Sequence, residues 1–302
     1  MLTQNSRMNG SDSAPPSSKK SRTHFRTVWI SDTHLGSRGS QAAELSHFLK
    51  RIDCETLYLV GDIIDFWRLK SKVYWPWQHN AVLRRLLKLA KRGTRVVIVP
   101  GNHDEALRPY AGTDFGGVVI KREDIHNCAD GRRLLVTHGD QFDLVVTNQR
   151  LLSFIGSAAY DWLVVINRHY NRYRRWRRKP YWSLSQYLKL RVKSACTYVS
   201  RFQESLVREA RSRSVDGVVC GHIHKPEIDL ESEIHYYNCG DWVESCTALV
   251  EYANGEMEII HAHDLLQESP EWAAGLDTLD TDLFEDELET DLDLGRQPLP
   301  LR

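Results

Sequence analysis

Apolar runs alternate with helical patterns in the first third of the chain, and each run ends at polar residues of a similar kind. Short runs rich in β-branched residues and bounded by turn residues are typical of buried strands, so we predict strands over residues 27–31, 56–60 and 95–99. We predict a helix between the first two strands, over residues 42–52. A second helix is predicted where apolar residues recur at helical spacing from Leu83 to Ala90, with its end at Gly93.

A second group of strands follows later in the chain. Short apolar runs predict strands over residues 134–136, 218–220, 236–238, 247–251 and 257–261. Helices between the early strands and successive strands later favour a mixed α/β fold of the α+β type. In open α/β sheets the ligand crevice lies outside the carboxyl ends of the strands, so we expect the polar residues that follow the strands to meet in one crevice.

Composition divides the chain into distinct parts. Residues 1–24 are polar and rich in Ser and Pro, which predicts a disordered leader, and residues 264–302 hold twelve acidic residues and two arginines, which predicts an acidic tail. Residues 25–263 are predicted to form the folded domain. Within it, residues from about 143 to 214 interrupt the strand pattern with aromatic-rich helical sequence, which indicates an inserted helical cap.

Neither a signal peptide nor a membrane-spanning segment is predicted. The longest apolar stretch, residues 154–166, is too short to cross a bilayer and contains Asp161. The six cysteines form no Cys-x-x-Cys pair, which is typical of free thiols in a reducing compartment. We therefore expect a cytoplasmic protein.

Seven side chains of metal-ligand type directly follow five of the predicted strands, namely Asp32, His34, Asp62, Asn102, His138, His222 and His224. The Asp-x-His and His-x-His pairs are expected to place both side chains on one side of an extended backbone, aimed at one centre. Carboxylate, amide and imidazole donors suit Mn²⁺, with Fe and Zn²⁺ as alternatives. Seven donors exceed the needs of one ion, so the pattern predicts two divalent ions bridged by a carboxylate.

Each of these residues alone also has a simpler explanation. A lone histidine at a strand end is more often an ordinary surface or core residue, and an isolated Gly-Asp or Gly-Asn-His is a common turn. Five matching strand ends in one chain favour a metal site over five separate coincidences.

The residues fall in short motifs that resemble a known enzyme family, the calcineurin-like metallophosphoesterases. The similar motifs, over about residues 25–263, are Asp32-x-His34, Gly61-Asp62, Gly101-Asn102-His103-Asp104, His138 and Gly221-His222-x-His224. The resemblance implies a two-sheet β-sandwich flanked by helices, with a dimetal site at the strand ends.

The resemblance also implies a role for each residue. Asp62 would bridge two ions that are held by Asp32, His34 and His224 on one side and by Asn102, His138 and His222 on the other. His103 would contact the phosphate and help to protonate the leaving group. Asp104 would orient the imidazole of His103, since a carboxylate typically fixes an imidazole tautomer.

Longer stretches around these motifs resemble the UDP-2,3-diacylglucosamine pyrophosphatases of bacterial lipid A synthesis. The similar stretches are residues 31–36, 61–67, 138–140 and 221–226. Those enzymes also carry a helical cap between the positions of His138 and His222, where this chain has 83 residues, and they have Arg at the position of His103. The resemblance implies a nucleotide-diphosphate lipid substrate that is cleaved to UMP and an acylated sugar 1-phosphate.

The predicted cap combines basic residues with aromatic ones. Residues 162–203 hold eleven basic residues and no acidic residue, with the densest cluster at Arg174, Arg175, Trp176, Arg177 and Arg178. This composition is typical of a surface facing the substrate lipid or an anionic membrane, and also of a platform for single-stranded nucleic acid. A solvated basic helix with core aromatics is the third interpretation. We favour lipid over nucleic acid because the apolar stretches 151–155 and 162–166 offer surface that nucleic acid would not use.

The sequence therefore predicts a metal-dependent hydrolase in which a metal-bound hydroxide attacks a phosphoester or pyrophosphate. We expect it to associate peripherally with the inner face of the membrane, and no protein partner is inferred. A phosphodiesterase or nuclease is the alternative enzyme, and a non-catalytic scaffold of the same fold is the alternative of another class. The complete ligand set argues against the scaffold, because a scaffold would be free to lose it.

Overall fold

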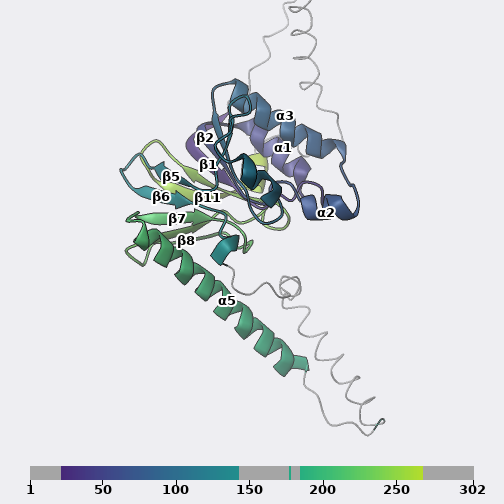
Figure 1. Cartoon of the computed structure of the whole chain (residues 1–302), viewed down its shortest axis with the longest axis vertical. Coiled ribbons are helices and arrows are strands. Elements are labelled where there is room, and N and C mark those ends of the chain that lie inside the picture. The colour runs from purple at the N-terminus through teal and green to yellow at the C-terminus, as the bar shows by residue number, and fades with distance from the viewer. Residues whose placement is uncertain (1–21, 143–176, 178–183, 268–302) are drawn as a thin grey trace, which may run out of the picture.

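The structure, a computed structural model, describes residues 22–142, Arg177 and residues 184–267, with the backbone alone over residues 184–197 and 266–267 (Figure 1). Its centre is a pair of stacked β-sheets with helices on both outer faces. The predicted mixed α/β class and two-sheet architecture are confirmed.

The first sheet has six strands in the order β11-β10-β1-β2-β3-β4. Their bounds are β1 (Thr23–Ile30), β2 (Ile52–Val60), β3 (Arg95–Val99), β4 (Val118–Ile120), β10 (Thr247–Glu251) and β11 (Met257–His261). β1 to β4 run parallel, whereas β10 is antiparallel to both of its neighbours. The carboxyl ends of β1, β2 and β3 therefore meet at one edge of this sheet.

The second sheet has five strands in the order β5-β6-β7-β9-β8. Their bounds are β5 (Asp124–Asn127), β6 (Arg133–Val136), β7 (Gly217–Cys220), β8 (Glu227–Asp229) and β9 (His235–Asn238). β6, β7 and β9 are parallel, and the two edge strands are antiparallel to their neighbours. This sheet thus also gathers parallel strand ends, those of β6 and β7, at one edge.

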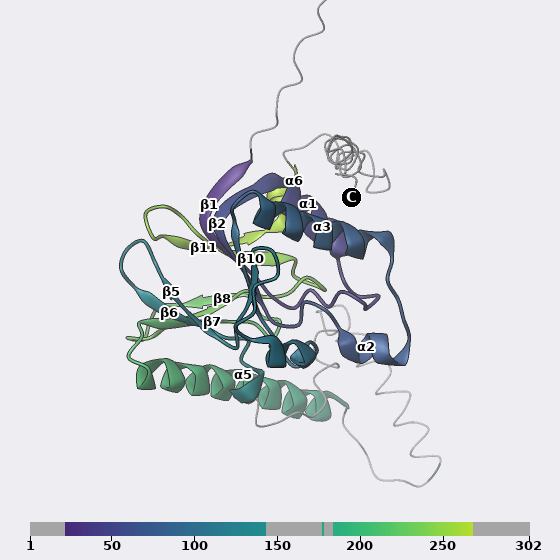
Figure 2. The same cartoon turned by 45° about the horizontal axis from the view of Figure 1, so that its top comes forward.

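Helices cover the outer faces of both sheets (Figure 2). α1 (Ala42–Arg51), α3 (Trp77–Lys91) and α6 (Ala262–Gln267) lie over the six-stranded sheet, and α5 (Leu184–Ser212) lies under the five-stranded sheet. Three shorter helices, α2 (Phe66–Ser71), η1 (Glu105–Tyr110) and η2 (Asp140–Phe142), belong to loops that follow strand ends. Within the described residues, no helix is long and apolar enough to cross a bilayer.

Successive side chains of each strand point to opposite faces of its sheet, and the apolar ones form three layers: one between the sheets and one under the helices on each outer face. In β1, Val28 and Ile30 face α1 and α3, whereas Trp29 lies between the two sheets. In β7, Val219 faces the space between the sheets, and Val218 and Cys220 face α5. Because successive strand residues point to opposite faces, an unbroken apolar run is required wherever both faces are covered.

Most predicted strands match the structure closely, but β1 and β2 each start four residues earlier than predicted. β2 starts at Ile52 instead of residue 56, directly after α1, and its first half pairs in parallel with Thr23–Phe25 of β1. Asp53 and Glu55, which alternate with the buried Ile52 and Cys54, hide this half of the strand from a search for apolar runs. The same pairing starts β1 at Thr23, inside the segment predicted as a leader.

The last part of the predicted cap belongs to the core of the domain. Phe202, Leu206 and Ala210 of α5 are buried against the five-stranded sheet, while the first half of α5 extends beyond the sheets in Figure 1. At the other predicted boundary, α6 covers residues 262–267 and contacts α1, so the fold continues past the expected start of the acidic tail.

Candidate metal centre

The two sheets bring all seven predicted ligand residues to their common carboxyl edge. Asp32 and His34 follow β1, Asp62 follows β2 and Asn102 follows β3, all in the six-stranded sheet. From the five-stranded sheet come His138, after β6, and His222 and His224, after β7. The edge at which the predicted ligand residues meet is therefore formed jointly by both sheets.

The backbone at these strand ends is left-handed. Asp32, His34, Asp62, His222 and His224 have φ between 46° and 70°, values that residues other than glycine rarely adopt. The expectation that the Asp-x-His and His-x-His pairs point together from an extended backbone is wrong, since both residues of each pair lie in left-handed turns. Such backbone strain persists only where the surrounding structure enforces it, and it concentrates at functional sites.

A first group of donor atoms consists of Asp32, His34 and His224. The Nε2 atom of His224 lies 3.1 Å from Oδ1 of Asp32 and 3.4 Å from Nε2 of His34. All three ligand atoms lie within 4.8 Å of one another. This spacing is compact enough for one ion to contact the three side chains.

A second group consists of Asp62, His138 and His222, and Asp62 also reaches the first group. Its Oδ2 atom lies 3.5 Å from Nε2 of His138 and 3.8 Å from Nε2 of His34. The carboxylate therefore stands between a histidine of each group, which is the position that a bridging ligand requires.

Glycines allow the loops to approach this closely. A Cβ atom at Gly101 would lie 2.3 Å from Oδ1 of Asp62, and one at Gly61 would lie 2.1 Å from Nδ1 of His138. Any side chain at either position would displace a predicted ligand. The glycines that precede Asp62 and Asn102 are thus part of the site.

Three buried atoms of the predicted ligands form no hydrogen bond of ordinary geometry, namely Asp32 Oδ1, which has only the contact with Nε2 of His224 at 3.1 Å, Asn102 Oδ1 and His138 Nε2. Leaving a buried polar atom unpaired usually costs about 1–3 kcal/mol, so such groups call for an explanation. His138 donates from Nδ1 to the carbonyl oxygen of Val60 at 2.9 Å, which directs Nε2 into the site. The donor set therefore fits divalent cations.

The charges of the site are strongly coupled. Burial alone would lower the pKa of His138, but the carboxylates of Asp62 and Asp32 outweigh it and raise this pKa to about 10. Burial likewise opposes the charged form of His224, and Asp32 raises its pKa to about 9. Burial would raise the pKa of Asp32, yet the neighbouring histidines hold it well below its usual range. The site thus favours ionised carboxylates with positive charge between them, a charge that cations can supply.

His103 lies beside the ligands, and its partner is a residue that the sequence analysis missed. Its Nδ1 donates to Oδ1 of Asp65 at 2.9 Å, and its Nε2 lies 3.9 Å from Oδ2 of Asp62. Asp65 also lies 3.4 Å from Nδ1 of His34 and caps α2 by accepting the N–H of Arg68. The sequence Gly-Asp-Ile-Ile-Asp carries Asp65 as an ordinary helix cap, so its position three residues after Asp62 was the only available signal.

The predicted role of Asp104 is wrong. Its carboxylate accepts backbone N–H groups of Gly101, Asp62 and Ile63 at 2.6, 3.3 and 2.8 Å, and it is fully buried. Because its oxygens are committed to these amides, it ties the loop after β2 to the loop after β3 and does not contact the imidazole of His103. Asp65 has the orienting position instead.

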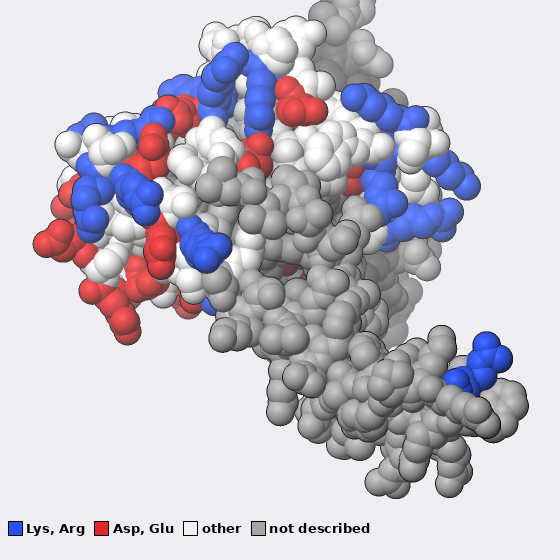
Figure 3. All heavy atoms as spheres, turned by 60° about the horizontal axis from the view of Figure 1, so that its bottom comes forward, with Lys and Arg blue, Asp and Glu red and all other residues white. Residues whose placement is uncertain are grey.

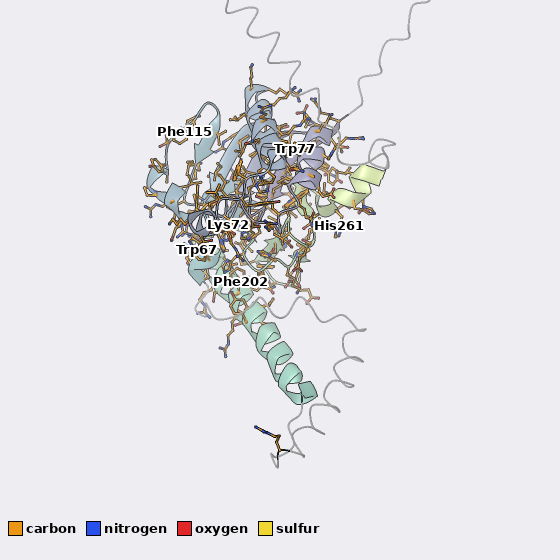
Figure 4. The ribbon with its side chains drawn as sticks, turned by 90° about the vertical axis from the view of Figure 1, so that its right-hand side faces the viewer. Trp67, Lys72, Trp77, Phe115, Phe202 and His261 are labelled. Carbon is orange, nitrogen blue, oxygen red and sulfur yellow. The ribbon has the colours of Figure 1, made fainter. Side chains whose placement is uncertain are left out.

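Two aromatic side chains border the site. The ring of Trp67 on α2 lies 4.2 Å from that of His103, centroid to centroid, and 45% of Trp67 is exposed (Figure 4). On the other side, Phe202 of α5 lies 5.8 Å from the ring of His222 and covers Gly139. The buried half of α5 thus reaches the predicted ligands directly.

The basic cluster of the predicted cap is mostly outside the described residues. Arg174, Arg175, Trp176 and Arg178 lie outside them, and Arg177 is described as an exposed residue in a turn. The predicted substrate- or lipid-facing role of this cluster therefore remains a prediction.

A further cluster of ligand-type residues, His126, Cys128 and Glu251, lies between the sheets beside the middle of β1. Glu251 accepts from Arg26 at 2.7 Å, from His126 at 2.7 Å and from the N–H of Ala129 at 2.7 Å. The guanidinium already balances the carboxylate, so this cluster is explained as a buried ion pair that joins the two sheets.

The fold and the donor set together define a metal-dependent phosphoesterase. The chain belongs to the calcineurin-like phosphoesterase family, whose sequence pattern matches residues 25–226. This membership covers all seven predicted ligand residues and implies divalent metal ions at the site.

Curated relatives carry a more specific name. The chain is 26% identical to the UDP-2,3-diacylglucosamine hydrolase of Azotobacter vinelandii, over 67% of this chain and 83% of that protein. It is 23% identical to the enzyme of the same name from Aliivibrio fischeri, over 75% of this chain and 94% of that protein. Among solved structures, vacuolar protein sorting 29 of Cryptosporidium parvum aligns over 78% of this chain and 94% of that chain, with a TM-score of 0.37 and 12% identity.

Proposed function

We propose that this protein is a dimetal phosphohydrolase that cleaves the pyrophosphate bond of a UDP-linked acylated sugar. The observation that carries the proposal is the convergence of two groups of ligand atoms on Asp62, together with buried donor atoms that have no other partner. In a protein without bound ions these atoms would be a net cost, whereas divalent ions would satisfy them.

The proposed ligands divide between two Mn²⁺ ions, with Fe and Zn²⁺ as alternatives. Asp62 would bridge the ions, which would be held by Asp32, His34 and His224 on one side and by Asn102, His138 and His222 on the other. Two divalent ions held here would supply Lewis-acid polarisation of the phosphate and an activated water. The carboxylates of Asp32 and Asp62 balance part of the ionic charge.

His103 is proposed as the general acid for the leaving group. Asp65 holds Nδ1 of its imidazole, so Nε2 is directed toward Asp62 and the space where the phosphate would lie. Burial alone would lower the pKa of His103, but Asp65 and Asp62 raise it above its ordinary value. The contact with Asp65 thus stabilises the imidazolium, whose Nε2–H would be available to the leaving oxygen.

The substrate assignment draws on the relatives named UDP-2,3-diacylglucosamine hydrolase and on the predicted basic, apolar cap. A phosphodiesterase or nuclease uses the same metal chemistry, and only the substrate distinguishes it. A lipid-linked substrate also supports a cytoplasmic enzyme that associates with the inner face of the membrane.

The test is a substrate screen with purified protein loaded with Mn²⁺. UDP-2,3-diacylglucosamine, a generic phosphodiester and single-stranded DNA are offered at equal concentration, and phosphorus NMR identifies the products. We expect UMP and acylated sugar 1-phosphate from the first substrate at the highest kcat/KM. Preferred cleavage of DNA would replace the proposal with the nuclease, and no cleavage of any substrate despite bound ions would favour the scaffold.

A further inference from the structure

The chain between Asp65 and Asp104 contains nine Lys and Arg residues and no acidic residue. Three of these basic residues, Arg68, Lys70 and Lys72, are exposed on α2 and the loop after it. No carboxylate in the described part of the chain forms an ion pair with any of the three. In Figure 3, Lys and Arg side chains gather on the right, the side of the molecule on which α2 lies in Figure 1.

Exposed apolar side chains stand among these basic residues. Val73 is 77% exposed, Trp67 is 45% exposed and Trp77 is 41% exposed, and Figure 4 shows this side of the molecule with Trp67, Lys72 and Trp77 labelled. The guanidinium of Arg38 adds a further positive charge 4.9 Å from the ring centroid of Tyr74. Aromatic and aliphatic side chains exposed between basic residues are typical of a surface that enters the headgroup region of a membrane.

The helix itself is firmly attached to the domain. Leu69 packs so closely on Gly36 that a Cβ atom there would lie 2.8 Å from Cγ of Leu69, and Asp65 caps the first turn. The exposed residues of α2 are therefore presented by a fixed support beside the metal centre, since Trp67 also contacts the ring of His103.

We propose that the α2 surface, formed by Arg38, Trp67, Arg68, Lys70, Lys72, Val73 and Trp77, docks on an anionic lipid bilayer. The basic residues contact the headgroups, and Val73 and Trp77 enter the interface between headgroups and acyl chains. These basic residues would also attract nucleic acid. Nucleic acid would, however, offer no apolar surface to the exposed side chain of Val73. Docking would place the metal centre next to the bilayer, whatever the identity of the substrate.

The experiment is sedimentation of the full-length protein with vesicles. One set contains one part phosphatidylglycerol to two parts phosphatidylcholine, and the other contains phosphatidylcholine alone. Each basic residue near an anionic bilayer contributes roughly fivefold to binding, so a variant with Arg68→Gln, Lys70→Gln and Lys72→Gln should bind the anionic vesicles about a hundredfold more weakly.

A matched control removes the same charge elsewhere. Arg122, Arg208 and Arg211 are exposed, and the last two lie at the C-terminal end of α5, on the opposite side of Figure 1 from α2. Changing all three to Gln should leave the affinity for anionic vesicles within about fivefold of that of the wild type. Fivefold is roughly the contribution of a single basic residue near the bilayer. A second variant, Val73→Ser, should weaken by up to about tenfold the binding that persists at about 1 M salt, where charges are screened and apolar burial remains. Equal melting temperatures would confirm that all variants are folded.

Several results would overturn the proposal. These are absence of wild-type binding to anionic vesicles, equal loss in the α2 variant and its control, or loss only when Arg174, Arg175, Arg177 and Arg178 are changed. Tight, α2-dependent binding of single-stranded DNA without vesicle binding would replace the bilayer with nucleic acid. Because the measurement involves no turnover, failure of docking leaves the proposed hydrolase intact, and failure of the hydrolase leaves docking intact.

Discussion

Replacing Asp65 with Asn tests the proposed role of His103 as general acid. The change removes neither His103 nor any of the predicted metal ligands. Asn retains the capacity to cap α2, since Asn and Asp are comparable N-caps. It removes the negative charge that accepts Nδ1–H of His103 at 2.9 Å, and the side chain of Asp65 is only 3% exposed, so water does not replace the contact. A hydrogen bond to a charged group contributes about 1.5–3 kcal/mol, which corresponds to a loss of roughly 10–10²-fold in kcat.

The assay compares two phosphodiesters with different leaving groups. A good leaving group departs without a proton, so Asp65→Asn should leave its kcat nearly unchanged, whereas a poor leaving group should show the full loss. Asp65 raises the pKa of His103, so the acid form persists to higher pH in the wild type. The alkaline limb of the kcat profile should therefore move to lower pH in the variant. Asp65 also contacts His34, a predicted metal ligand, so metal analysis checks that the variant still binds its ions.

Two controls separate this role from a structural one. Glu251→Gln breaks a similarly buried contact, that of Glu251 with His126 at 2.7 Å, far from the metal centre, and should lower the melting temperature without changing kcat. In a His103→Ala background, Asp65→Asn should lower kcat little further, because Asp65 acts through His103. Equal loss for both leaving groups, an unmoved alkaline limb and additive effects with His103→Ala would refute the reasoning.

Three further predictions concern the ligands and the acid. Asp62→Ala should abolish turnover and release metal, measured by elemental analysis, and full activity with both ions retained would contradict the bridging role. His103→Ala should lower kcat by about 10²–10⁴-fold with metal content intact, and His103→Arg should retain more activity on a pyrophosphate-linked lipid than the alanine variant does. With the pKa of His138 raised to about 10 and that of His224 to about 9, both imidazoles hold protons at neutral pH until metal binds. Loading should release about two protons, seen by calorimetry in buffers of different ionisation enthalpy, and its affinity should rise with pH.

The parts of the fold with strong local signals could be predicted from the sequence. The predicted bounds of β3, β10 and β11 match the structure, because each is a short apolar run between turn residues. The meeting of the seven predicted ligand residues could be predicted for a related reason, since parallel strands place whatever follows them at one edge. Neither inference needs knowledge of how the two sheets stack.

The rest depends on contacts between distant segments. Asp65 and Asp104 are both acidic residues just after strand ends, and only the packed loops decide that Asp65 contacts His103 while Asp104 binds backbone amides. The left-handed turns at Asp32 and His222 likewise result from the approach of loops from two sheets, and the sequence pattern suggests extended backbone there. The short edge strands β5 and β8, only four and three residues long, carry too few residues to show a periodic pattern.

Anomalous X-ray scattering from crystals of the Mn²⁺-loaded protein would locate the bound ions. We expect two peaks about 3.5–4 Å apart at the joint edge of the two sheets, with Asp62 in contact with both. Nε2 of His138 should coordinate one ion, and Oδ1 of Asp32 should coordinate the other. A single peak, or peaks at the His126–Cys128–Glu251 cluster with none beside Asp62, would contradict this expectation.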